Sequence, residues 1–456
     1  MDILYILAFV AIGSVVTYLS GNRWAKSVSL VFSLLALATL SKILLFGNFT
    51  KISVFHTWFQ NPNIDFDLLL NGNSLIFVLL TLVAVPIIIA ASSVQEITNQ
   101  KSFFALVLIM EFALLGTFLA NNAILFYIFW ELALIPIYFI ALLWGDENRK
   151  QATLTFFLYT FIGSLFLLIG LILVAYYPAL ALYYSTFVFL SIFVAFAVKI
   201  PIFPFHSWQA NIYQSSPMVG SMLLSGVMLK MGFWGIFRWM LPYVDKDILY
   251  CNQTQHIILA LALFGVLYGA ILAIKQNNLK RLLAYSSFSH VGLIAMGLFV
   301  MNESGTKGAF IQSFAHGINI IGLFYIAQII FNRTQTFSIK SLGGIWQKAP
   351  IFSAFSLVIV LASISMPLTN AFVGEFMLLN GIFQYHWIVA LVASLSVILG
   401  AVYMLRMFQY AFLGSPSENT ENFKDVSLVE SILLAIITTI IFITGIIPNL
   451  LLQFIS

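Results

Sequence analysis

The chain has 456 residues, of which 61% are hydrophobic and 8% charged, with a formal net charge of +4 and a mean hydropathy of +1.03. A soluble domain carries about 25% charged residues and about 45–50% apolar ones, so this composition excludes a water-soluble protein. The single cysteine excludes a disulfide framework and a multi-cysteine metal site, and the small net charge gives no basis for nucleic-acid binding. The composition therefore indicates a polytopic membrane protein.

The apolar runs are continuous, whereas the strands of a membrane barrel would alternate apolar and polar residues. We therefore expect an all-α fold, a single membrane domain over 1–456 with about fourteen transmembrane helices. In chain order they are predicted at 2–20, 26–46, 68–93, 102–120, 122–143, 152–177, 184–204, 216–240, 256–275, 281–301, 308–331, 350–384, 388–412 and 427–455.

Prolines predict that the seventh and twelfth helices are broken in mid-membrane. Pro201 lies in VKIPIFPFHSW and Pro367 in SMPLTNAFVGEF, and a proline inside a helix removes one backbone hydrogen bond and clashes with the preceding turn. If 102–240 (helices 4–8) and 256–413 (helices 9–13) are repeats, each break falls in the fourth helix. Five helices is an odd number, so the second repeat would be inverted, as in many transport proteins. The alternative is a coincidence between prolines.

Helices 1–3 (1–93) and helix 14 (427–455) would then flank the two repeats. The distribution of Lys and Arg predicts how the whole chain is oriented in the membrane, because positive residues favour cytoplasmic loops. Loops after odd-numbered helices hold twelve of these residues and loops after even-numbered helices hold three. Both termini are therefore expected on the outer side of the membrane.

Charged and titratable residues occur where a membrane span should be apolar. A charge at the bilayer centre costs at least about 2.5–3.5 kcal/mol, so such residues usually have a function. Glu131, for example, lies about nine residues into its span, or about 14 Å deep at 1.5 Å per residue. Seven residues form such a row in the sequence and are candidates for proton transfer: Glu111, Glu131, Lys199, Lys230, His290, His316 and Glu375.

Each of these residues has a simpler interpretation. A buried acid or lysine can form a structural ion pair, and a histidine in a membrane helix can be a packing residue. Lys42 and Arg406 lie nearer the span ends, where long side chains reach the interface. The set at similar depth in successive helices favours proton transfer, and Tyr285, Ser286, Ser287, Ser289 and Asn319 could hold bridging water.

Several motifs, in order, resemble the antiporter-like subunits of respiratory complex I. They are FWELALIPIYFIALLWG (129–145), AFAVKIPIFPFHSW (195–208), SPMVGSMLLSGVMLKMGFWGIFRW (216–239), LKRLLAYSSFSHVGLIAMG (279–297), FAHGI (314–318) and FVGEF (372–376). The chain is most similar to the M-type subunit of bacterial NADH-quinone oxidoreductase. Glu375 stands where sister subunits typically have lysine, and the chain stops after helix 14, without the lateral helix of the L-type subunit.

The resemblance implies roles for the seven residues. Glu131 would be the acid of the first half-channel, Lys199 its partner lysine, Lys230 the central lysine and Glu375 the exit acid. His290 and His316 would belong to the connecting polar axis, and Glu111 would be the acid one helix earlier. The chain departs from the family pattern after FHSW, where QANIYQSSP replaces an LPDAH-like segment, and at MPLTNAF, where the family has more glycine.

The resemblance also implies a function: a proton-translocating, non-redox membrane subunit of a respiratory NADH-quinone or related quinone oxidoreductase in the bacterial cytoplasmic membrane. NADH or another electron donor, FMN, Fe–S clusters and quinone would belong to partner subunits, and no cofactor or metal is expected in this chain. Its partners would be neighbouring antiporter-like subunits and lipid. The alternative is a subunit of an Mrp-type cation/proton antiporter or of a membrane-bound hydrogenase.

Overall fold

The computed structural model describes residues 2–46, 51–60, 63–242 and 252–455. Lys246, one of the three basic residues counted in the loops after even-numbered helices, lies outside this part. Twelve helices among the described residues are long and apolar enough to cross a membrane. Two shorter apolar helices are Ser185–Lys199 and Pro350–Ser363. Each is the first half of a further apolar segment whose helix is interrupted directly after it. The multi-pass helical fold is thus confirmed, while the exact number of fourteen stays a prediction.

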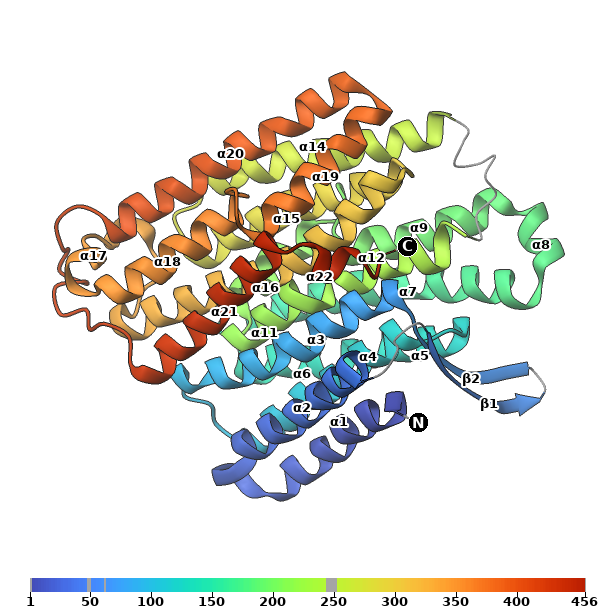
Figure 1. Cartoon of the computed structure of the whole chain (residues 1–456), viewed down its shortest axis with the longest axis horizontal. Coiled ribbons are helices and arrows are strands. Elements are labelled where there is room, and N and C mark those ends of the chain that lie inside the picture. Colours follow the sequence, from blue (N-terminus) through green and yellow to red (C-terminus); the bar gives the residue numbers. More distant parts are fainter. Residues whose placement is uncertain (1, 47–50, 61–62, 243–251, 456) are drawn as a thin grey trace.

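The N-terminal half of the chain contains a β-hairpin and a series of helices (Figure 1). Its elements are α1 Asp2–Leu19, α2 Gly21–Phe46, β1 Ile52–Gln60, β2 Asn63–Leu70, α3 Gly72–Ala91, η1 Ser92–Val94, α4 Gln100–Leu119, α5 Ala123–Leu132, α6 Leu134–Trp144, α7 Arg149–Tyr176, α8 Pro178–Tyr183, α9 Ser185–Lys199, α10 Ser207–Ser215, α11 Met218–Leu223, η2 Leu224–Met228, α12 Lys230–Gly235 and η3 Ile236–Met240.

In the described part of the C-terminal half, the named elements are all helices. Its elements are α14 Asn252–Lys275, α15 Leu279–Phe299, α16 Glu303–Thr334, η4 Ile339–Ser341, α17 Ile345–Lys348, α18 Pro350–Ser363, α19 Asn370–Tyr385, α20 Trp387–Phe412, α21 Leu428–Ile446 and α22 Asn449–Leu452. Asparagine starts several helices: Asn278 caps α15 and Asn302 caps α16 by accepting a hydrogen bond from a backbone N–H of the first turn.

The hairpin is a feature that the sequence interpretation missed. The third helix was expected to begin at residue 68, but Leu68–Leu70 belong to β2, which pairs antiparallel with β1. The helix begins instead at Gly72, where Asn71 and Ser74 form a reciprocal capping box. Three hydrophobic residues at the end of a strand resemble the start of an apolar helix, which explains the error.

Both predicted breaks are present. The first separates α9 from α10 over residues 200–206 and contains Pro201, and the second separates α18 from α19 over residues 364–369 and contains Pro367. The second half of the first broken helix is α10, which lies beyond residue 204, where the span was expected to end. Figure 1 shows α9 following α8 at one end of the molecule and α18 following α17 at the opposite end. The two broken helices therefore enter from opposite ends, as inverted repeats require; the repeat boundaries remain a prediction.

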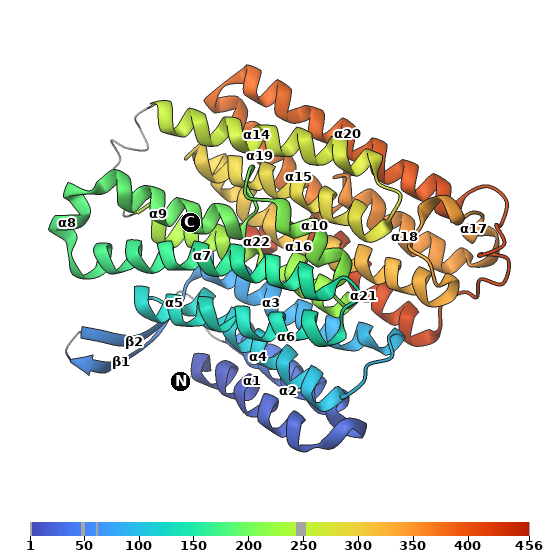
Figure 2. The ribbon, with the colours of Figure 1, turned by 180° about the vertical axis from the view of Figure 1, so that it is seen from behind.

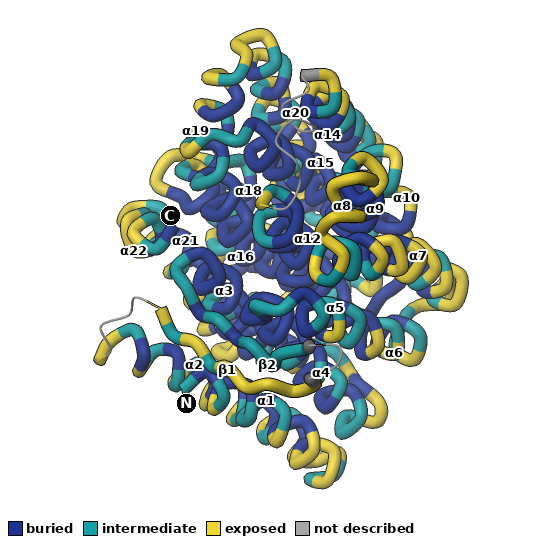
Figure 3. Tube along the Cα trace, turned by 90° about the vertical axis from the view of Figure 1, so that its right-hand side faces the viewer, coloured by how far each residue is buried: buried dark blue, intermediate teal, exposed yellow. Residues whose placement is uncertain are grey.

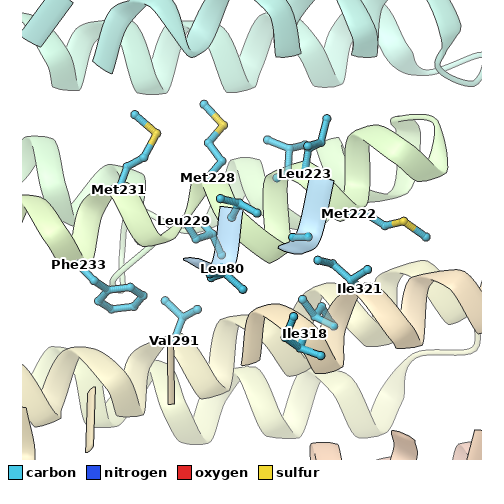
Figure 4. Close-up of a cluster of buried hydrophobic side chains, with 14 of the residues drawn as sticks. Leu80, Met222, Leu223, Met228, Leu229, Met231, Phe233, Val291, Ile318 and Ile321 are labelled. Atoms are coloured by element: carbon cyan, nitrogen blue, oxygen red, sulfur yellow. The ribbon is translucent and has the colours of Figure 1, made fainter. Parts of the chain in front are cut away.

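The middle of the bundle is more deeply buried than its periphery. Figure 3 shows α12, α15 and α16 buried at the centre, whereas α7 and α8 expose much of their surface. Figure 2 shows α7 and α14 on the outside of the bundle. Hydrophobic side chains pack around α11 and α12 in the close-up of Figure 4: Leu80 from α3, Val291 from α15, and Ile318 and Ile321 from α16. A charged group in this interior has little water around it.

Candidate proton-transfer site

Six of the seven predicted residues lie at irregular points of helices or on the buried central helices. Glu131 is next to the end of α5, Lys199 ends α9, and Lys230 begins α12 between two π-helical turns. His290 and His316 lie on α15 and α16, and Glu375 lies on α19 just after the second break. Helix irregularities expose backbone carbonyls and N–H groups, which suits polar chemistry in an apolar interior.

Glu131 and Lys199 interact electrostatically without contact. Glu131 lies beside Tyr127 and Ser164, and its carboxylate and the Lys199 amine influence each other. In the described part of the chain, no ion pair of 4.0 Å or less joins them. The Lys199 amine lies instead over the ring of Trp130, 5.0 Å from its centroid, and the Lys199 side chain is buried. The structure therefore shows the two charges in a separated arrangement.

The local fold explains this arrangement. Pro136 has no N–H for the carbonyl of Leu132, so the helix is interrupted at Ala133, directly after the turn that carries Glu131. Lys199 is the last residue of α9 before the break. Trp130, a neighbour of Glu131 in sequence, was not singled out as a partner of Lys199. A cation–π contact of a desolvated amine can contribute about 2 kcal/mol, comparable to a weak ion pair.

Lys230 is fully buried and has two polar partners. Its Nζ donates to the backbone carbonyl of Ser225 over 2.7 Å and lies 2.9 Å from Nδ1 of His316. The π-helical turn Leu224–Met228 widens the helix just before the lysine, which frees the Ser225 carbonyl for the side chain. Neither the π-helical turns nor this carbonyl partner was expected from the sequence.

His316 connects Lys230 to a small central cavity. The His290 and His316 rings lie 6.2 Å apart between centroids, and both line a cavity of about 20 Å³ together with Ser286, Gln312 and Asn319. This volume has room for one water molecule. The Nε2 atoms of both histidines are buried and have no hydrogen-bond partner within the described residues. A water molecule in this cavity would satisfy groups that are costly to leave unpaired.

Glu375 lies on α19, close to the second break. Its carboxylate accepts a hydrogen bond from the hydroxyl of Ser365, a residue within the second break that has a left-handed backbone (φ 58°). Its other oxygen is buried without a partner among the described residues. Ala371, one turn before Glu375 on α19, lines the central cavity. The second break therefore supplies the hydrogen-bond donor for this acid.

Glu111 is separate from the row in its contacts. It is fully buried, and its carboxylate accepts a hydrogen bond of 2.8 Å from Ser33 of α2, a helix outside the predicted repeats. Lys42 and Arg406 are exposed, and Arg406 donates to the carbonyl of Ile274. Their position near the membrane interface stays a prediction. Within the described residues, no group of three or more His, Cys, Asp or Glu side chains could hold a metal ion.

Comparison with known proteins identifies the family of the chain. Residues 120–400 match the model of the NADH:quinone oxidoreductase/Mrp antiporter transmembrane family, which includes all of the row except Glu111. The chain belongs to this family. It is 35% identical over 412 residues to the NADH-quinone oxidoreductase subunit M of Rickettsia typhi, covering 86% of this chain and 82% of the relative.

Two further relatives show the range of the family. The chain is 32% identical to the F(420)H(2) dehydrogenase subunit M of Methanosarcina mazei, covering 86% of this chain and 83% of the relative. It is also similar to a chain in the structure of respiratory complex I from Thermus thermophilus with bound NADH, with a TM-score of 0.89 and 28% identity. That similarity covers 100% of this chain and 97% of the other. The family predicted from the motifs is thus confirmed.

Proposed function

We propose that this chain is a proton-translocating membrane subunit of a respiratory NADH-quinone, or related quinone, oxidoreductase. The observation that carries the proposal is the contact between Lys230 and His316 in the apolar interior, next to a cavity that has room for water. Titratable groups linked in this way can hand protons along the row. The redox reaction takes place in other subunits, and this chain contributes proton transfer to it.

Glu131 and Lys199 form the switch of the first repeat in this proposal. When Glu131 reaches Lys199, the pair stabilises a negative carboxylate and a protonated amine. When it withdraws, the buried amine lies over the ring of Trp130, and the desolvation penalty then favours release of its proton toward Lys230. The Lys199 amine is then neutral and its proton has passed toward Lys230. Each movement of the Glu131 side chain therefore transfers one proton. Glu375 takes the role of the exit acid, while Glu111 has a supporting role at Ser33.

The expected surroundings follow from the family. We infer that neighbouring antiporter-like subunits and lipid are the partners, and that the electron donor, FMN, Fe–S clusters and quinone are held by other subunits. The chain would lie in a bacterial cytoplasmic membrane with both termini on the outer side, because the Lys- and Arg-rich loops follow odd-numbered helices. The relative in the F(420)H(2) dehydrogenase supports a broader choice of electron donor than NADH alone.

Substitution of Lys230 tests the proposal. We expect Lys230→Ala to leave the amount of assembled complex nearly unchanged and to lower the initial rate of proton pumping in reconstituted vesicles at least about tenfold, because a positioned proton carrier is lost. Lys42→Ala, at an exposed lysine near a helix end, is the matched control and should pump normally. Normal pumping by an assembled Lys230→Ala complex would contradict the proposal.

The alternative, a subunit of an Mrp-type antiporter or of a membrane-bound hydrogenase, stays open because the description of the matched family names Mrp antiporters beside NADH:quinone oxidoreductases. Purification of the chain with its native partners separates the two functions. Co-elution with quinone-reductase activity supports the proposal, whereas co-elution with antiporter subunits alone, together with Na⁺-driven proton movement in vesicles, supports the alternative.

A further inference from the structure

A second pocket opens near one end of the molecule, apart from the central cavity. It has a volume of about 80 Å³ and lies between the end of α14, the short helix η4 and the C-terminal part of α20. The side chains of Lys275, Lys340 and Arg406 line it, so it lies at the end that the Lys and Arg distribution assigns to the cytoplasm. Its volume has room for more than one water molecule.

Tyr403 lies between this pocket and the central cavity. It lines the pocket and is 1% exposed, and its hydroxyl forms a hydrogen bond of 3.1 Å with the hydroxyl of Ser286 on α15. Ser286 in turn lines the cavity that holds His290 and His316. One pair of hydroxyl groups is therefore the link between two spaces with room for water.

Glu375 lies on the inner side of this link. It interacts electrostatically with Tyr403 and is held by Ser365 in the second break. The three positive side chains at the mouth of the pocket make a resting excess proton there unfavourable, while the carboxylate beyond Tyr403 attracts one. A proton would therefore cross the pocket without accumulating in it, and the tyrosine is the point at which passage can be controlled.

We propose that Tyr403 and Ser286 form a proton passage between the pocket at the Lys275 end of the chain and the central histidine cavity. In an inward step, a hydronium ion in the pocket gives its excess proton to the phenolic oxygen and becomes neutral water, while the phenolic proton moves to the hydroxyl oxygen of Ser286. The serine proton then moves to a water molecule in the cavity. Each hydroxyl ends with one hydrogen, one proton has moved, and rotation of the two O–H bonds resets the link. The passage gives the second repeat its own route to this side of the membrane.

The passage rests on the proposed function and adds a route that the row of seven residues does not contain. Tyr285, Ser287, Ser289 and Asn319 were named with Ser286 as possible water-holding residues, but nothing in the sequence pointed to Tyr403. The signal is tertiary: α20 contacts both α14 and α15, which places a tyrosine 117 positions away against Ser286.

Substitution to phenylalanine removes the Tyr403 hydroxyl and keeps the ring that packs in the core. We expect the complex that contains Tyr403→Phe to assemble and to lose pumping in vesicles about tenfold, because the hydroxyl relay is interrupted. Ser286→Ala removes the other hydroxyl and should give a similar loss, and the double variant should be no worse than either single one, as expected for two groups that act as a unit. Tyr325→Phe, at another buried tyrosine whose hydroxyl has no hydrogen-bond partner in the described part of the chain, is the matched control and should pump normally.

The outcomes separate this inference from the proposed function. If Lys230→Ala stops pumping while assembled Tyr403→Phe and Ser286→Ala complexes pump normally, the passage is wrong and the function stands. If Lys230→Ala also pumps normally, the proposed function fails. Should Tyr403→Phe not assemble, the Ser286→Ala complex decides alone, and additive losses in an assembled double variant would also overturn the passage.

Discussion

At the scale of single residues, the buried titratable side chains of the candidate row contact partners that do not carry the opposite charge. Lys199 lies over an aromatic ring, Lys230 bonds a backbone carbonyl and a histidine, and Glu375 accepts from a serine hydroxyl. None of these partners carries the opposite full charge. Neutral partners satisfy hydrogen bonds while leaving each group able to gain or lose a proton, whereas a tight buried ion pair would fix both charges.

Glu131 provides the residue-level test of the switch. Glu131→Gln removes the negative charge that attracts the Lys199 amine, so we expect pumping in vesicles to fall at least about tenfold. Glu131→Asp keeps the charge on a shorter side chain and should have a milder effect. Equal pumping by the Gln variant and the unsubstituted protein, with both complexes assembled, would contradict a role for the pair.

At the scale of elements, the position of Lys230 depends on how closely two helices approach. Gly226 in the π-helical turn and Gly317 on α16 face each other: a Cβ built on Gly317 would lie 2.8 Å from the carbonyl oxygen of Gly226. His316, the partner of Lys230, is the preceding residue. The sequence motifs contain both glycines, but only the packing shows that they let α16 approach the irregular helix.

Gly317→Ala tests this close approach. The added methyl group meets a backbone atom that cannot rotate away, so the helices must separate and the contact of 2.9 Å between Lys230 and His316 should lengthen. We expect a loss of stability of about 1–3 kcal/mol, measured as a lower thermal-unfolding midpoint, together with reduced pumping.

Gly163→Ala on α7 is the matched control, because a Cβ there would meet Val198 at 3.4 Å, an ordinary contact. Gly163→Ala should leave both the thermal-unfolding midpoint and the pumping rate close to those of the unsubstituted protein. An unchanged midpoint and unchanged pumping in Gly317→Ala would show that the approach of the two helices is not required.

At the scale of the whole molecule, a largely buried ion pair joins α21, the last long helix in the described part of the chain, to the central helix α16. Arg333 near the end of α16 forms an ion pair of 2.8 Å with Glu430 on α21 and also donates to the carbonyls of Lys424 and Asp425. Asp425 accepts from the N–H groups of Ile351 and Phe352 at the start of α18. These contacts join the central helix to the first half of the second broken helix, away from the proton-transfer row.

Removal of this anchor should affect stability more than proton transfer. In Arg333→Ala, the buried Glu430 loses its charge partner, so we expect the free energy of unfolding to fall by about 3 kcal/mol. Lys307→Ala, which removes the exposed i,i+4 pair with Glu303, is the control and should leave the thermal-unfolding midpoint nearly unchanged. Thermal unfolding of the assembled complex measures both, and a similar midpoint for the two variants would contradict the anchor.

The sequence by itself determined much of this protein. Long apolar runs specify membrane helices because the bilayer leaves the backbone no other partner, and Pro201 and Pro367 specify the breaks because proline lacks an N–H. The motifs identified the family, and the depth of each charge in its span selected the residues of the row. Such features are local in the chain, so a single pass through the sequence can find them.

Tertiary structure decided the partners of those residues. Trp130 beneath Lys199, the Ser225 carbonyl on Lys230, Ser33 on Glu111 and Ser365 on Glu375 follow from helix packing and from irregular turns, which no periodicity in the sequence specifies. The hairpin at 52–70 was missed because its last strand ends in leucines that resemble a helix start. A membrane helix is apolar on every face, so its sequence does not tell which face meets which neighbour; close packing between residues far apart in the chain decides that.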